Sequence, residues 1–235
     1  MTAMIIDFEA TDATSEAQAT EIGHMAVMFS DKGLVKDGAV GVRSELCKPD
    51  TVITFGSMAV THITPDDVAN KASHKDVCNR ILPKGEAYII GHNIDFDIQV
   101  AANAGIDVSQ YKAICTLALA RYTWPESETH KLGALSYEHD YNFAREHAKN
   151  AHNAATDVTM CARLLHKICS IHGINDMQKL FELSEYARVP TILTFGKYKG
   201  TAISEVVKTD SSYLDWLYNA TDDKYLQIAI SRARA

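Results

Sequence analysis

Carboxylates at the end of an apolar segment constrain this 235-residue chain more than any other feature of its sequence. Asp7 and Glu9 flank Phe8 at the end of the first apolar run, Ala3–Phe8, which predicts a buried strand. Because side chains alternate across a strand, the two carboxylates share one face of the sheet. A carboxylate on an apolar surface costs several kcal/mol unless it is paired or binds a metal ion. Any fold of this chain must therefore compensate both charges.

Two further carboxylates have similar surroundings. Asp97 lies at the start of a predicted helix, Phe96–Ala104, which follows a predicted strand, Tyr88–Gly91. Asp157 lies on the apolar stripe of the clearest predicted helix, Asn153–Ile171. If all four carboxylates converge, two Mg²⁺ or Mn²⁺ ions roughly 4 Å apart would compensate them. Such a pair of ions suits phosphodiester hydrolysis, because it activates a water and stabilises the leaving 3′ oxygen.

Each carboxylate taken alone has a simpler interpretation. Asp97 would be a first-turn residue whose negative charge is stabilised by the dipole of its helix. The Asp7 and Glu9 pair would be solvated at the end of its strand. Asp157 would lie on the surface if the apolar stripe were shifted by one position. Only the convergence of all four predicts a metal site.

His152 is the fifth candidate, five residues before Asp157. We predict that the segment Glu138–Ala151 before it is a mobile loop. An imidazole held there could accept the proton of the attacking water, and a group that is neutral near pH 7 suits a general base. The alternative is a structural histidine, which is the commoner role of a single histidine.

The order of the predicted elements indicates an α/β fold. The predicted strands Ala19–Ser30 and Leu34–Cys47 continue the first strand as an antiparallel meander, and later strands alternate with helices. This order predicts a mixed central sheet with helices on its faces. We expect three parts: a catalytic domain over residues 1–175, a connector over 176–190, and a small α+β module over 191–235. The module is predicted as a hairpin around residues 196–200 followed by two amphipathic helices.

The charge and the cysteine content limit the classes of function that are open to this chain. The net charge is −7, with 16 basic and 25 acidic residues over positions 1–185 and 7 basic and 5 acidic residues over 186–235. This balance disfavours tight non-specific binding to nucleic acid, yet carboxylates that surround divalent cations remain compatible with a phosphate substrate. Five scattered cysteines without a C-x-x-C pair indicate reduced thiols. With no apolar run of about 18 residues and no signal-peptide pattern, we expect a cytoplasmic protein that does not bind membranes.

The spacing of these residues resembles the three exonuclease motifs of the DEDDh family. That family includes the proofreading epsilon subunit of bacterial DNA polymerase III, ribonuclease T, oligoribonuclease and exonuclease X. The matching segments are Asp7-Phe8-Glu9, His92-Asn93-Ile94-Asp95-Phe96-Asp97 and His152-x₄-Asp157, with further likeness at Glu21-Ile22-Gly23 and Thr61-His62-Ile63-Thr64. Within the family the exonuclease X group is the best fit. Its likeness is carried by the segments Ile114–Arg121, Trp124-Pro125, Thr194–Gly200 and Tyr213–Leu217.

The resemblance implies an RNase H-like fold and a 3′→5′ exonuclease that acts on DNA with a free 3′ end, single-stranded or duplex. Asp7, Glu9, Asp97 and Asp157 would hold two Mg²⁺ ions, for which Mn²⁺ would substitute, and His152 would be the general base. Asn93 and Phe96 would line the pocket for the terminal nucleotide, with the backbone of Ala10 and Thr11 close to its base and sugar. Because dimers occur in the family, a homodimer is a further expectation.

One residue departs from the family pattern. Asp12 stands where many relatives have glycine, so the backbone geometry beside the substrate, and the fine substrate preference, do not carry over. Two other functions stay open. One is an exoribonuclease of the ribonuclease T or oligoribonuclease type, because the metal chemistry is indifferent to the sugar. The other is an inactive nucleic-acid-binding or partner-docking protein.

The C-terminal module has two interpretations. Phe195, Lys197, Tyr198 and Lys199 lie together on a predicted tight turn, and aromatic faces beside cations are what single-strand binding uses. Alternatively, its aromatic residues form only the small core of the module. The sequence does not choose between a binding role and a packing role.

Overall fold

The computed structural model of the protein describes residues 1–36, 41–147, 149 and 152–234. It divides into two compact units, Met1–Ser184 and Glu185–Ala235. The division falls within helix α9 (Met177–Arg188), inside the stretch 176–190 that the sequence predicts as a connector.

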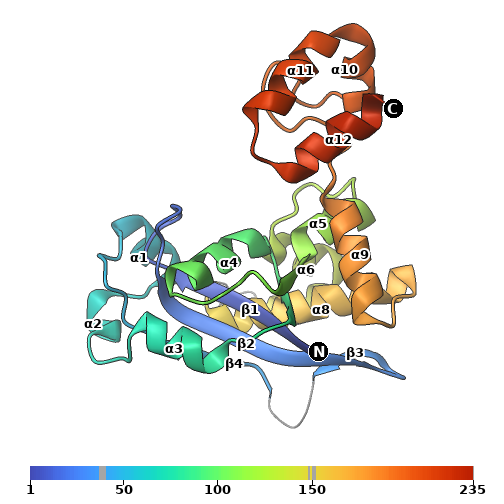
Figure 1. The fold of residues 1–235 in the computed structure, drawn as a ribbon. Helices are drawn as coiled ribbons and strands as arrows, with labels where there is room; N and C mark the ends of the chain where they lie inside the picture. The colour runs from blue at the N-terminus through green and yellow to red at the C-terminus, as the bar shows by residue number, and fades with distance from the viewer. Residues whose placement is uncertain (37–40, 148, 150–151, 235) are drawn as a thin grey trace. The chain divides into compact units, whose positions relative to one another are not determined.

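In the described part of the first unit, six strands form one mixed sheet (Figure 1). They are β1 (Thr2–Ala10), β2 (Ala19–Ser30), β3 (Gly33–Lys36), β4 (Arg43–Leu46), β5 (Ala87–Gly91) and β6 (Tyr111–Cys115). Their order is β3-β2-β1-β5-β6, and β4 also pairs with β2. The β1–β2 pair is antiparallel, whereas β1–β5 and β5–β6 are parallel. This arrangement confirms the predicted α/β class with a mixed sheet.

The segment predicted as one strand, Leu34–Cys47, is two strands in the structure. β3 pairs with Val27–Ser30 of β2 and β4 pairs with Glu21–His24 of the same strand. Because β2 is 12 residues long, it can accept two short partners in succession. Residues 37–40, which lie between them, are outside the described residues.

Isoleucines fill the centre of the sheet. The parallel strands β1 and β5 are covered on both faces, which is why they are apolar at successive positions rather than at alternate ones. The fully buried isoleucines of the central strands are Ile5, Ile6, Ile22, Ile89, Ile90 and Ile114.

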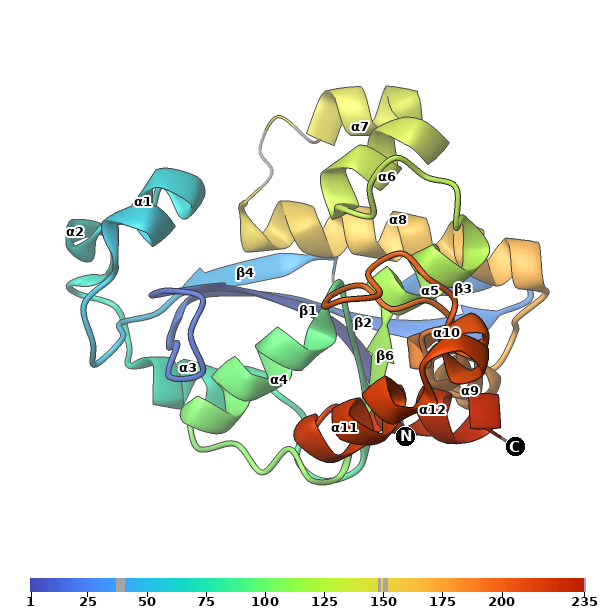
Figure 2. The ribbon, with the colours of Figure 1, turned by 90° about the horizontal axis from the view of Figure 1, so that it is seen from above.

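Helices cover both faces of this sheet (Figure 2). Those of the first unit are α1 (Phe55–Thr61), α2 (Pro65–Val68), α3 (His74–Ile81), α4 (Ile94–Asn103), α5 (Thr116–Thr123), α6 (Leu132–His139), α7 (Tyr141–His147) and α8 (Ala154–His172), followed by α9. Helix α8 lies on one side of the sheet with α6 and α7 beyond it, and α3 and α4 lie on the other side. None of the helices in the described ranges has the length and apolar character needed to cross a membrane. The cytoplasmic location stays a prediction.

The long helix predicted over Asn153–Ile171 is confirmed as α8. Asn153 is its N-cap, and the side chain of Asn153 accepts a hydrogen bond from the Thr156 N–H. Gly173 ends the helix in the left-handed conformation, with φ of 63°. The predicted apolar stripe is buried, including Val158 and Leu165.

The prediction of a loop over Glu138–Ala151 is wrong for most of that segment. It contains the end of α6 and the whole of α7. Ala144 on α7 is buried, and Phe143 lies under the Arg163 side chain of α8, 5.5 Å from its guanidinium carbon. These packing contacts outweigh the polar local sequence. Residues 148, 150 and 151 are outside the described residues.

The second unit has its own apolar core. Its helices are α10 (Ile203–Thr209), α11 (Ser211–Ala220) and α12 (Lys224–Arg234), so three helices follow the turn rather than the predicted two. Asp210 separates the first two, because it ends α10 and accepts a hydrogen bond from the Tyr213 N–H as the N-cap of α11. The core residues are Leu193, Ile203, Val206, Leu214, Leu217, Leu226, Ala229 and Ile230.

The turn over residues 193–201 is closed by backbone hydrogen bonds between Leu193 and the Gly200–Thr201 pair. Lys197 on this turn is paired with Asp210 at 2.8 Å and lies over the Tyr198 ring. The aromatic residues of this unit are compatible with both a packing role and a nucleic-acid-binding role. Tyr198 and Tyr213 pack against the core, whereas Phe195 and Trp216 are 48% and 61% exposed.

Candidate active site

The end of β1 carries two of the predicted acidic residues. Asp7 pairs with Gly23 and Glu9 pairs with Glu21 across the antiparallel β1–β2 ladder. Residues directly opposite in such a ladder point to the same face of the sheet. Glu9 is only 8% exposed. The strand therefore places Asp7, Glu9 and an additional carboxylate, Glu21, on one face.

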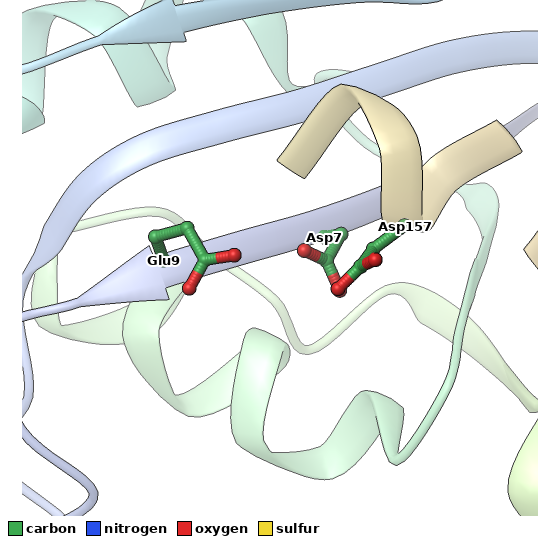
Figure 3. Close-up of side chains that lie close together, drawn as sticks. All are labelled: Asp7, Glu9 and Asp157. Carbon is green, nitrogen blue, oxygen red and sulfur yellow. The ribbon is translucent and has the colours of Figure 1, made fainter. Parts of the chain in front are cut away.

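Asp157 reaches this face from α8. It lies in the first turn of the helix, where its N–H bonds to the Asn153 carbonyl oxygen. One carboxylate oxygen from each of Asp7, Glu9 and Asp157 lies within 4.8 Å of the other two. Figure 3 shows the carboxylates of Asp7 and Asp157 pointing toward one another, with Glu9 nearer the end of β1.

Asp97 approaches the same strand from α4, in the plane of the sheet. The parallel ladder with β5 stops at the Ile5–Ile90 pair, so the Phe8 N–H has no strand partner on that side. The Asp97 carboxylate accepts this N–H at 2.9 Å, between Asp7 and Glu9 along the chain. In the structure Asp97 is thus bonded to the backbone of the cluster, and it lies outside the 4.8 Å group of three.

Gly91 makes the approach of Asp97 possible. A Cβ at this position would lie 2.7 Å from Ile94 Cδ1 and 3.1 Å from the Ile6 carbonyl oxygen. The same Cβ would be 3.6 Å from the Asp97 carboxylate. A side chain here would therefore force the buried Ile94 side chain at the start of α4 to move.

Mutual proximity and burial raise the pKa values of all four carboxyls. Burial, then the charges of Asp97, Asp157, Glu9 and Glu21, hold the pKa of Asp7 well above its usual range. Burial and the charges of Asp157 and Glu21 raise the pKa of Glu9 to about 7. Without a cation, the site therefore favours protonated carboxyl groups.

The other two carboxyls have partly offsetting partners. Burial raises the pKa of Asp97 to about 8, against the opposing effect of its hydrogen bond from the Phe8 N–H. Burial raises the pKa of Asp157 to about 6, and the His152 imidazole and backbone act in the opposite direction. Among Glu9, Asp97 and Asp157, the Asp157 carboxyl group therefore loses its proton most easily.

The composition of this cluster fits a hard divalent cation. All of its ligand atoms are carboxylate oxygens, which are the ligands that Mg²⁺ prefers in proteins. Within the described residues, Asp157 Oδ1 is buried and has no hydrogen-bond partner. Buried polar atoms almost always have a partner, so an orphaned carboxylate oxygen that faces other carboxylates indicates a cation site.

His152 lies directly before the N-cap of α8. It is exposed, and its φ of 66° places it in the left-handed region, which non-glycine residues seldom occupy. The charge of its imidazole and its backbone lower the pKa of Asp157, against the larger effect of burial. His152 therefore interacts electrostatically with the candidate metal ligand five residues later.

The predicted substrate residues fall into two groups. Asn93 is exposed at the N-terminus of α4, with a left-handed φ of 67°, and Phe96 is half-buried one turn later. Ala10 and Thr11 are buried at the end of β1. The Ala10 carbonyl accepts a hydrogen bond from Ser57 Oγ, so this backbone is held firmly.

The substitution of Asp12 for glycine does not require an unusual backbone. Asp12 is not among the non-glycine residues with positive φ in the described chain. Its carboxylate accepts hydrogen bonds from the Thr14 hydroxyl and from the Thr14 N–H, the latter at 2.7 Å. These bonds form a local turn and lower the pKa of Asp12. The turn after β1 is therefore stabilised by hydrogen bonds to the Asp12 carboxylate and does not depend on the conformational freedom of a glycine.

Comparison with known proteins matches both units. The exonuclease family matches residues 4–165, and the exodeoxyribonuclease X-like C-terminal family matches residues 193–226. Exodeoxyribonuclease 10 of Escherichia coli (strain K12) is 31% identical over 183 residues, covering 78% of this chain and 79% of that protein. A PolC-type DNA polymerase III of Lacticaseibacillus paracasei is 28% identical over 152 residues, which are 62% of this chain and 10% of that protein.

Solved structures share the fold. Exonuclease X in complex with 5′ overhanging duplex DNA superposes with a TM-score of 0.59 and 26% identity, covering 77% of this chain and 99% of that one. Exonuclease I superposes with a TM-score of 0.59 and 19% identity, covering 81% of this chain and 44% of that one, which shows the RNase H-like fold. The chain therefore belongs to the exonuclease family of the DEDDh type, with a C-terminal domain of the exodeoxyribonuclease X type.

Proposed function

We propose that this protein is a metal-dependent exonuclease that removes nucleotides one at a time from the 3′ end of DNA. The observation that carries the proposal is the cluster of Asp7, Glu9 and Asp157 within 4.8 Å, with Asp97 bonded to the backbone between the first two. The similarity of this protein to exodeoxyribonuclease 10, and to an exonuclease X solved with duplex DNA, supports DNA as the substrate.

We further propose that Asp7, Glu9, Asp97 and Asp157 hold two Mg²⁺ ions, for which Mn²⁺ substitutes. When bound, such a pair supplies Lewis acidity to activate the attacking water and to stabilise the leaving 3′ oxygen. The four carboxylates come from three elements of the fold, β1, α4 and α8. The pair of ions would therefore link these elements. The raised pKa values of these groups indicate how strongly the site favours a compensating positive charge.

The remaining roles belong to side chains around the cluster. His152 would accept the proton of the attacking water at its imidazole, which interacts electrostatically with the Asp157 carboxylate. Asn93 and Phe96, at the start of α4, would hold the terminal nucleotide. The buried backbone of Ala10 and Thr11 would form a fixed wall beside its base and sugar.

A panel of oligonucleotides tests the proposed activity and both alternatives. With Mg²⁺, 5′-labelled DNA should shorten in one-nucleotide steps, whether single-stranded or duplex with a 5′ overhang, and EDTA should stop the reaction. A 3′-terminal phosphorothioate bond should delay the first step, because the reaction begins at that end. Faster shortening of RNA would favour the exoribonuclease alternative, and binding without any shortening would favour the inactive binding protein.

The clustered carboxylates also predict a pH-dependent stability. In the unfolded chain such acids lose their protons near pH 4. In the folded protein the pKa values of Asp157, Glu9 and Asp97 are about 6, 7 and 8. The folded state thus binds more protons between about pH 4 and pH 8, so the free energy of unfolding should fall as the pH rises through this window. Melting temperatures in EDTA measure the loss, and saturating Mg²⁺ should reverse most of it.

The variant Asp157→Asn isolates this effect. It removes one of the repelling charges, so in EDTA it should melt several degrees above the wild type at about pH 8 and at nearly the same temperature at about pH 4. It should also gain less from Mg²⁺ and release no nucleotides. Asp31→Asn, in the exposed turn between β2 and β3, is the matched control and should leave the pH profile unchanged. Equal pH profiles for wild type and Asp157→Asn would contradict the proposed repulsion.

His152→Ala tests the general base. A base typically contributes about 10²–10⁴-fold to turnover, so kcat should fall by roughly that factor. The Mg²⁺ concentration that gives half-maximal stabilisation against heat should stay within about twofold of wild type, because the four ligands are intact. His147→Ala, on α7 five residues earlier, is the matched control. Wild-type turnover by His152→Ala at saturating Mg²⁺ would show that another group takes the proton.

A further inference from the structure

Glu21 is a buried carboxylate beside the site to which the proposed mechanism gives no role. It lies on β2 opposite Glu9, is only 5% exposed, and faces the N-terminus of α8. A fifth carboxylate adds charge of the same sign to the cluster, and it contributes to the raised pKa values of Asp7, Glu9 and Asp157. Some other interaction of Glu21 must therefore offset the cost of burying its charge beside the cluster.

That interaction is with the first turn of α8. Glu21 Oε2 accepts the Ala154 N–H at 3.2 Å, and Glu21 Oε1 accepts the Asn153 side-chain amide at 3.4 Å. Asn153 in turn accepts the Thr156 N–H through its side-chain oxygen, at 3.3 Å. Helix N-termini leave N–H groups without partners and favour negative charge, and Glu21 meets both requirements from a neighbouring strand. Its two oxygens thus clamp two consecutive residues of the helix start.

An independent feature shows that this helix end is pressed against β2. A Cβ on Gly23 would lie 2.3 Å from the Ala154 carbonyl oxygen and 2.9 Å from the Ala154 Cβ. Any side chain at position 23 would therefore displace the first turn of α8. Gly23 pairs with Asp7, so the contact lies directly beside the cluster.

The two clamped residues, Asn153 and Ala154, lie between the candidate base and the candidate ligand of α8. His152 immediately precedes Asn153, and Asp157 follows Ala154 by three residues. Any shift of the clamped pair therefore moves the candidate base and a candidate ligand together, relative to Asp7 on β1. Displacement of reacting groups by about 1 Å can reduce turnover by 10²-fold.

We propose that Glu21 is a positioning residue, which anchors the start of α8 on β2 and so sets where His152 and Asp157 stand relative to Asp7 and Glu9. This inference rests on the proposed roles of His152 and Asp157. Glu21 acts through hydrogen bonds to Ala154 and Asn153, without contact to metal or substrate. Both its reach and its two acceptor oxygens are required.

Two conservative variants separate these requirements. Glu21→Gln keeps the length but replaces one acceptor oxygen with a donor amide, which in either orientation faces one of the two donors, the Asn153 amide or the Ala154 N–H. Glu21→Asp keeps the charge but is one methylene shorter, so its carboxylate falls short of α8. Each should lower kcat by about 10-fold to 100-fold with KM for DNA within about twofold, and should raise the Mg²⁺ concentration for half-maximal rate.

A control on the same strand identifies a general effect on stability. Thr20 is also buried on β2, and its hydroxyl has no hydrogen-bond partner within the described chain. Thr20→Val should leave kcat and the Mg²⁺ dependence unchanged. Hydrogen exchange supplies a readout independent of activity, because the amides of Ala154 and Thr156 should exchange faster in both Glu21 variants while the amides of the middle of α8 keep their protection.

Coupling to His152 completes the test. If Glu21 acts through the base, Glu21→Gln should cost much less in a His152→Ala background than in the wild type. If the wild type releases nucleotides from DNA but both Glu21 variants match it in kcat and Mg²⁺ dependence, the positioning role is wrong and the proposed function stands. If the wild type releases none, the proposed function fails first. Should Glu21→Gln not fold, Glu21→Asp alone decides the question by the same measurements.

Discussion

Mutual repulsion among carboxylates at the end of β1 is the constraint on which the rest of this structure depends. Asp7, Glu9 and Asp157 bring oxygens within 4.8 Å of one another, with Glu9 buried and Asp7 and Asp157 half-buried. Without a bound cation, repulsion among these carboxylates destabilises the folded protein. The raised pKa values of the three groups reflect this repulsion together with their burial. The large apolar sheet beneath, with its buried isoleucines, holds the charges together in spite of that cost.

Two glycines let helices reach these charges from different sides of the sheet. Gly91 leaves room for Asp97 at the start of α4, and Gly23 leaves room for the start of α8 on β2. Each helix then attaches to the sheet by a carboxylate bond to a backbone N–H. Asp97 accepts the N–H of Phe8 on β1, whereas Glu21 of β2 accepts the N–H of Ala154 on α8. The geometry of the cluster is therefore fixed by backbone contacts rather than by contacts among the acidic side chains.

The sequence predicts the cluster because a carboxylate on an apolar surface conflicts with local physics, and the DEDDh spacing places four such conflicts in order. It predicts the mixed sheet for a similar reason, since strand patterns are strong where strands are buried. It fails over residues 138–147, where α7 depends on packing against α8 rather than on local pattern. It also gives no role to Glu21, although Glu21 stands in an apolar strand as Asp7 does. Only the β1–β2 register and the approach of α8 show what its charge meets.

We propose that Asp7, Glu9, Asp97 and Asp157 form one two-metal site. Crystals grown with saturating Mn²⁺ and measured at the manganese absorption edge test it most directly, because anomalous scattering locates the ions without reference to activity. We expect two peaks roughly 4 Å apart, in contact with oxygens of all four carboxylates. Well-ordered crystals with no manganese among these residues, or with manganese bound only elsewhere, would contradict it.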